Sequence, residues 1–194
     1  YAKQDAEKLS GKGDTSQKLT LMKTSADSLK KSADALNDSS LWEKKKIKKK
    51  DEKTGEEIEV EDYDWDKITK AVKSFVEDYN DVVKEAGESN TKDVLRNASW
   101  MTGMTDKNSN MLAKIGITIG KGNKLELDED ALKQADISSL KTVFTGYNSF
   151  VSKISQKATG ISNAANRASA TYTNNGTYSK TDSSLTSIKI DKEV

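Results

Sequence analysis

The sequence of 194 residues contains no cysteine, no histidine and no proline. Without cysteine and histidine there can be no thiol nucleophile, no Ser-His-Asp triad, no disulfide framework and no thiolate or imidazole ligand for a metal. Any metal would need an all-oxygen shell. Arginine is scarce too: only Arg96 and Arg167 stand among the 32 basic residues. Bidentate recognition of phosphates or nucleic-acid bases is therefore not expected.

Net charge and long apolar runs are also lacking. The 32 Lys+Arg balance 31 Asp+Glu and leave a net charge of +1, which argues against a dedicated nucleic-acid binder. No run approaches the roughly 18 apolar residues that cross a bilayer, and the start of the chain does not resemble a cleaved secretion signal. Hydrophobic residues make up 34 %. That share suits long helices that each bury one stripe.

Heptad spacing predicts three long helices, at about 16–38, 66–86 and 147–172. Each carries apolar residues at intervals of three and four, which line one side of a helix, and Tyr147 is the first residue of the third stripe. We expect these stripes to cover one another in an elongated, mainly α bundle of antiparallel or mixed direction. The expected structural core comprises Leu29, Leu36, Phe75, Tyr79, Ile115, Leu125, Leu127, Phe150 and Ile154.

A charged segment at about 42–64 is expected to form a β-hairpin inserted in the bundle, with strands at about 43–61. A run of lysines around one isoleucine precedes an acidic run, and Thr54-Gly55 between them is a turn signal. If these are the two turn residues, Lys48 faces Glu61 across the hairpin.

A hairpin-helix module is expected at about 112–145. Isoleucines alternate over 115–119 and leucines over 125–127, on either side of a glycine-containing turn, which predicts a hairpin at about 115–127. Asp128 follows as the N-cap of a short helix with an acidic first turn.

Other segments are expected to be short or irregular. Residues 1–14 should fray, and a helix that begins at Asn90 or Thr91 should break at Gly103. The helical bundle domain then spans 1–172, and 173–194 form a polar tail or a terminal hairpin.

Two blocks of sequence resemble a known family. Residues 71–83 are similar to the "AVKxFVxxYN" helix in the C-terminal region of bacterial flagellar filament-cap proteins, known as flagellar hook-associated protein 2. Residues 112–132 are similar to the "LAxIGIT…GKLxLDExxL" signature of the same proteins. The blocks stand in the family's order, and the resemblance covers roughly 68–150. The charged hairpin and the Asn/Ser/Thr-rich end have no counterpart in it.

The resemblance implies a non-enzymatic structural protein without a cofactor. Such a protein would be exported through the flagellar secretion apparatus without a cleaved signal and act outside the cell, on the bacterial flagellum. There it would self-associate into a homo-oligomeric ring on the growing filament and help flagellin or other filament subunits to assemble. A chain without cysteine and proline suits this path, since neither disulfide formation nor prolyl isomerisation delays its refolding.

Other interpretations stay open. The chain could be a secreted or surface helical interaction protein that shares this module without a flagellar role. The basic run 44–50 could bind a polyanion, although an acidic run lies one turn away. The pattern Asp62-x-Asp64-x-Asp66 resembles the start of a calcium loop, but the glycine and glutamate that should follow are missing, which favours helix capping. Scattered carboxylates identify no catalytic residue and no metal site.

Overall fold

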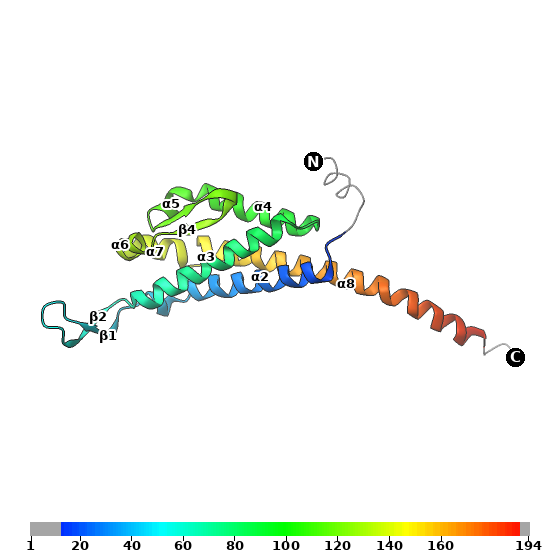
Figure 1. The fold of residues 1–194 in the computed structure, drawn as a ribbon, viewed down its shortest axis with the longest axis horizontal. Helices are drawn as coiled ribbons and strands as arrows, with labels where there is room; N and C mark the ends of the chain where they lie inside the picture. Colours follow the sequence, from blue (N-terminus) through cyan, green and yellow to red (C-terminus); the bar gives the residue numbers. More distant parts are fainter. Residues whose placement is uncertain (1–12, 191–194) are drawn as a thin grey trace.

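The computed structural model describes residues 13–190, and their side chains up to residue 171. Long helices lie side by side as an elongated bundle, with shorter helices on one side and a hairpin at one end (Figure 1). Two small antiparallel sheets of two strands each complete the described part. The fold class predicted from the sequence, mainly α with small hairpins, is confirmed.

Three long helices make up the bundle: α2 (Ser16–Leu36), α3 (Trp65–Gly87) and α8 (Phe150–Ile190). Helix α2 is antiparallel to α3 and α8, and these two helices are parallel to each other (Figure 1). The bundle therefore has mixed helix directions. The apolar stripes explain this packing, because the buried positions of α2 and α3 follow the heptads of the sequence.

Helix α8 differs from its predicted bounds at both ends. It begins at Phe150, and Tyr147, which was expected on the core stripe, is 83 % exposed. Its backbone continues to Ile190 where a polar tail or hairpin was expected from 173, and it extends beyond the other helices (Figure 1). Serine, threonine and asparagine lower helix propensity only slightly, and no proline interrupts the helix. Residues 1–12, predicted to fray, lie outside the described part.

Shorter elements connect the long helices. Helix α4 (Lys92–Lys107) passes through Gly103, so the predicted break there is wrong; one glycine inside a helix costs about 1 kcal/mol, too little to end it. Helix α4 packs against α3 and α8. The remaining elements are η1 (Ser39–Trp42), α5 (Ser109–Ala113), β3 (Ile117–Ile119), η2 (Lys121–Asn123), β4 (Leu125–Leu127), α6 (Glu129–Gln134) and α7 (Ile137–Phe144).

The charged hairpin forms, but in a register different from the expected one. Strands β1 (Lys45–Lys50) and β2 (Glu57–Asp62) place Lys48 opposite Glu59, not Glu61. The loop is longer than two residues because the Asp51 carboxylate accepts the N–H of Lys53 at 2.7 Å and starts an Asx turn. A shift of two residues leaves each side chain on its expected face.

Aromatic rings tie the helices together where the hairpin leaves the bundle. Trp42 is buried, donates its Nε1–H to the carbonyl of Leu36 at 2.7 Å and stacks on Phe144 with 5.5 Å between ring centroids. Phe75 lies edge-on to Phe144 and Phe150. Of the nine expected core residues, Leu127 is partly buried against the core and the others are buried: Leu29, Leu36, Phe75, Tyr79, Ile115, Leu125, Phe150 and Ile154.

Candidate functional site

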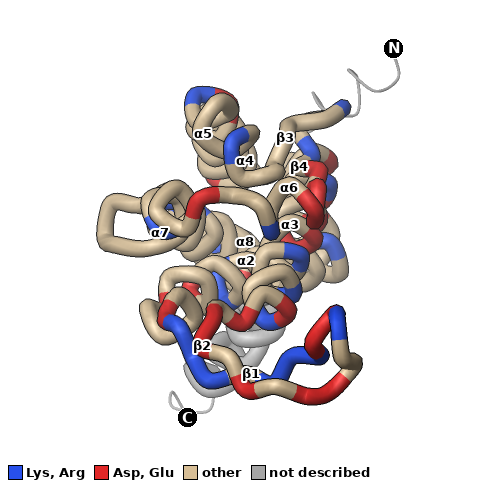
Figure 2. Tube along the Cα trace, turned by 90° about the vertical axis from the view of Figure 1, so that its left-hand side faces the viewer, with Lys and Arg blue, Asp and Glu red and all other residues tan. Residues whose placement is uncertain are grey.

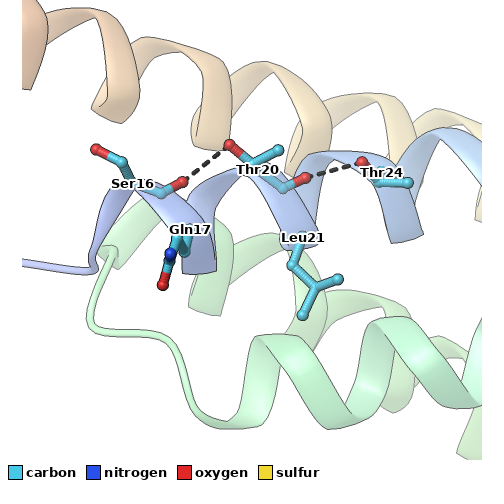
Figure 3. A pocket seen from close by; sticks show the side chains of 5 residues that line it. All are labelled: Ser16, Gln17, Thr20, Leu21 and Thr24. Atoms are coloured by element: carbon cyan, nitrogen blue, oxygen red, sulfur yellow. Dashed lines mark hydrogen bonds between the residues drawn. The ribbon is translucent and has the colours of Figure 1, made fainter.

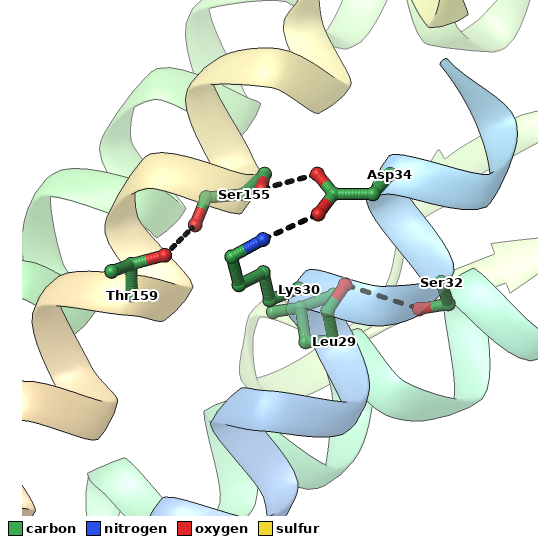
Figure 4. A network of polar contacts seen from close by, with 6 residues as sticks. All are labelled: Leu29, Lys30, Ser32, Asp34, Ser155 and Thr159. Carbon is green, nitrogen blue, oxygen red and sulfur yellow. Dashed lines mark hydrogen bonds and ion pairs between the residues drawn. The ribbon is translucent and has the colours of Figure 1, made fainter. Parts of the chain in front are cut away.

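A repeated polar contact joins α2 to α8. The hydroxyl of Ser155 donates to Asp34 at 2.6 Å, and seven residues further along α8 the hydroxyl of Ser162 donates to Asp27 at 2.6 Å. Lys30 completes the first contact from the neighbouring turn of α2, as Figure 4 shows. Because both contacts must be in register at once, they fix the antiparallel alignment of the two helices.

Hydrogen bonding lowers the pKa of both aspartates in this contact. Partial burial raises the pKa of Asp34, but hydrogen bonds from Lys30 and Ser155 outweigh it and hold the pKa below the usual value. The pKa of Asp27 is lowered in the same way, because hydrogen bonds from Lys23 and Ser162 outweigh its partial burial. Both carboxylates are therefore charged at neutral pH and serve as acceptors in the packing of α2 on α8.

Asp14 anchors the start of helix α4 from a distant part of the chain, because it binds the N-cap residue Thr91 and the two residues before it. Its carboxylate, 8 % exposed, accepts the hydroxyl of Ser89 at 2.6 Å, the N–H of Asn90 at 2.8 Å, and both the N–H and the hydroxyl of Thr91. Lys18 adds a hydrogen bond to the carbonyl of Glu88 at 3.1 Å. The expectation that residue 14 frays is wrong, because its carboxylate is held by several donors just before α4.

Residues of the first family-like block hold the small β3–β4 hairpin on α3. The amide of Asn80 donates to the carbonyl of Leu125 at 2.9 Å and accepts its N–H at 2.7 Å, as a neighbouring strand would. The buried hydroxyl of Tyr79 donates to Thr105 at 2.9 Å, and burial raises the pKa of Tyr79 to about 12. Both side chains therefore act in packing.

The second family-like block is built around Gly116. Its φ of +87° and its neighbours leave no room for a side chain, because an added Cβ would lie 2.7 Å from the carbonyl oxygen of Asp128. The N–H of Asp128 donates to the carbonyl of Gly116 at 2.8 Å, and the Asp128 side chain caps α6 at the N–H of Ala131. A glycine and a capping aspartate at these positions bring the hairpin directly onto α6.

Helices α4 and α8 approach closely and leave a half-exposed tryptophan at their edge. A Cβ on Gly160 would lie 2.6 Å from Oδ1 of Asn97, which donates its amide to the carbonyl of Asp93. Trp100 is 45 % exposed, with the ammonium of Lys157 4.1 Å from its ring centroid. The neighbouring Met101 is buried, and Met104 and Met111 pack partly buried against the core.

An open depression of ≈ 340 Å³ lies along the start of α2. The hydroxyls of Thr20 and Thr24 each donate to the backbone carbonyl four residues earlier (Figure 3), while Leu21 is 50 % exposed. These hydroxyls serve the helix itself and do not converge on a common point. The depression therefore has the character of a shallow contact surface rather than of a binding pocket.

The acidic pattern before α3 has a structural role. Asp64 accepts the N–H of Lys67 at 3.1 Å and caps the helix, as the capping interpretation predicted. Asp62 accepts from Lys49 across the hairpin and from the N–H of Tyr63. In the part of the chain that the structure describes, no group of three acidic side chains could hold a metal ion. Within residues 13–190, no helix is long and apolar enough to span a bilayer.

Sequence reasoning missed Asp14, Asn80, Ser155 and Ser162 as partners. The sequence does contain a signal for the two serine contacts, since Asp27 and Asp34 are seven residues apart and so are Ser155 and Ser162. Two heptads of opposite direction that carry matched polar residues favour pairing across an antiparallel interface. Asp14 had none, because its partners are 75 to 77 residues away.

A comparison with protein families matches residues 89–193 to the family described as Flagellar hook-associated protein 2 C-terminus. The match covers more than half of the chain and includes α4, the β3–β4 hairpin, α6 and α7. No curated protein and no solved structure matches the chain.

Proposed function

The chain belongs to the flagellar hook-associated protein 2 C-terminus family, and we propose that it is a non-enzymatic assembly protein at the tip of the flagellar filament. Copies of the chain associate with one another there, and the assembly helps flagellin subunits to insert into the growing filament. The protein reaches this place by flagellar export, outside the cell, and works through surface complementarity without a cofactor.

The family match over residues 89–193 carries this proposal. Its supporting observation is the use of chemistry-bearing side chains in the described part. Asp64 and Asp128 cap helices, Asp14 binds the N-cap residue of α4, and Asp27 and Asp34 join α2 to α8. Because these side chains are engaged in packing, we expect the protein to act through its surfaces and not through a cleft.

The mode of folding also suits an exported subunit. A chain without cysteine and proline has no slow covalent step or isomerisation after passage through a narrow channel.

Deletion of the gene in its host tests the proposal. We expect cells without normal filaments that release unpolymerised flagellin into the medium, with both defects reversed by a plasmid copy. Normal filaments and motility in the deletion strain would refute the filament-tip role and favour a secreted or surface interaction protein that shares this module.

A further inference from the structure

We propose that the β1–β2 hairpin joins neighbouring copies of this chain edge to edge, with β1 of one copy beside β2 of the next. This inference rests on the self-association proposed above and names the surface that produces it. The occupant of each free hairpin edge is thus a second copy of the same chain.

The hairpin is a two-stranded sheet that projects from the end of the bundle (Figure 1). Its base is held by the buried Trp42 and by Lys44, whose ammonium lies 5.7 Å from the ring centroid of Tyr63. A two-stranded hairpin is marginally stable in water by itself. Each of its outer edges presents backbone N–H and C=O groups that a further strand can pair.

Charge separates the two edges. Strand β1 has the sequence KKIKKK and strand β2 the sequence EIEVED. Lys48 faces Glu59 and Lys50 faces Glu57, so one face carries a basic column beside an acidic column. Figure 2 shows both signs gathered on this hairpin. The basic edge of one copy therefore matches the acidic edge of another.

This pattern selects one way of pairing copies. Two-fold pairing of β1 with β1 would set lysine beside lysine, and pairing of β2 with β2 would set glutamate beside glutamate, both unfavourable. Pairing of β1 with β2 continues the alternation of sign across every strand. Such a head-to-tail contact uses different surfaces on the two partners, which is the kind of interface that closes rings or extends filaments.

The opposite face of the hairpin adds an apolar contribution. Ile47 lies opposite Val60, and Ile58 on the same face is 39 % exposed. A neighbouring hairpin would continue this strip and cover part of it. A polyanion is a poorer occupant of β1, because the acidic β2 strand runs about 4.8 Å away and repels it.

Three charge variants test the pairing. The acidic variant converts β1, the basic variant converts β2, and the exchanged variant carries both sets and keeps every lysine–glutamate pair within the hairpin. The substitutions are Lys46→Glu, Lys48→Glu and Lys50→Glu in the acidic variant, and Glu57→Lys, Glu59→Lys and Glu61→Lys in the basic variant. Sedimentation velocity over a range of concentrations measures association of each.

We expect the wild-type chain and the exchanged variant to self-associate, and the acidic and basic variants to do so at least about tenfold more weakly. An equimolar mixture of the acidic and basic variants should recover association, which excludes loss of folding as the cause. Added salt should weaken all of these contacts.

The outcomes separate this inference from the proposed function. Single-sign variants that self-associate as the wild type does, or a mixture that fails to recover, would overturn the hairpin contact while self-association stands. A wild-type chain that stays monomeric throughout would overturn both. Monomers retained on heparin would assign the hairpin to a polyanion instead.

Discussion

The carboxylate of Asp14 accepts both the backbone N–H and the hydroxyl of Thr91, 77 residues further along the chain. This pair links the segment before α2 to the start of α4. Asp14 therefore holds Thr91, the N-cap residue of α4, against the segment that precedes α2.

Removal of the Asp14 carboxylate should destabilise the protein strongly. Asp14→Ala leaves the N–H groups of Asn90 and Thr91 without their acceptor, which we expect to lower the free energy of unfolding by about 2 kcal/mol. Urea denaturation followed by circular dichroism measures the change. Asp106→Asn, at an exposed position of α4, is the control and should stay within about 0.5 kcal/mol of the wild type. Equal stability of both variants would contradict this role of Asp14.

Stability should fall in acid for the same reason. Burial raises the pKa of Asp14, but hydrogen bonds from Ser89, Thr91 and two backbone N–H groups bring it below the usual 3.8. A folded-state pKa below the unfolded one stabilises the fold above the unfolded value and loses that contribution as pH falls through the folded value. The Asp14→Ala defect should therefore be full at pH 7 and shrink below about pH 4. A loss of stability in Asp14→Ala that stays constant across this pH range would show that the charge of Asp14 does not contribute.

Gly103 in α4 and Gly160 in α8 should respond differently to alanine. Nothing lies within 4 Å of a Cβ on Gly103, so Gly103→Ala should stabilise the helix by about 0.5–1 kcal/mol. Gly160→Ala presses on Asn97 and displaces its hydrogen bond to Asp93, which should cancel this gain. Thermal unfolding compares them. In an Asn97→Ala background, Gly160→Ala should become stabilising; the absence of this rescue would exclude close packing of α4 on α8 at this point.

The side-chain amide of Asn80 should contribute more to stability than its partly buried position suggests. Asn80→Ala removes both hydrogen bonds to the backbone of Leu125, at a cost of about 1–3 kcal/mol. Hydrogen exchange should locate the damage, with faster exchange at Leu125 and its strand neighbours and little change in α2. Uniformly faster exchange throughout the chain would point to global unfolding and not to a local clasp.

Short-range patterns in the sequence predicted much of this fold. The heptads gave the long helices because a stripe of apolar residues can be buried only against another helix. Asp128 and Asp64 stand directly before the helices that they cap, so capping could be inferred from position. The face on which each hairpin side chain lies could also be predicted, because successive side chains of a strand alternate between its two faces.

Other features depend on contacts that no local pattern contains. The Asx turn at Asp51 lengthens the hairpin loop and shifts the pairing of β1 with β2 by two residues. Asp14 reaches Thr91 only because the folded bundle brings the two segments together. The clasp of Asn80 on Leu125 joins residues 45 positions apart. Helix α8 runs past its predicted end because polar composition weakens a helix without stopping it.

The most direct test of the filament-tip role locates the protein on living cells. The chain has no cysteine, so Ser74→Cys, at an exposed position of α3, introduces a single thiol for labelling with a membrane-impermeant maleimide dye. In a motile strain that carries this variant in place of the wild-type gene, we predict one fluorescent focus at the distal end of each filament. Label spread along the filaments or over the cell body, with none at the tips, would contradict the account.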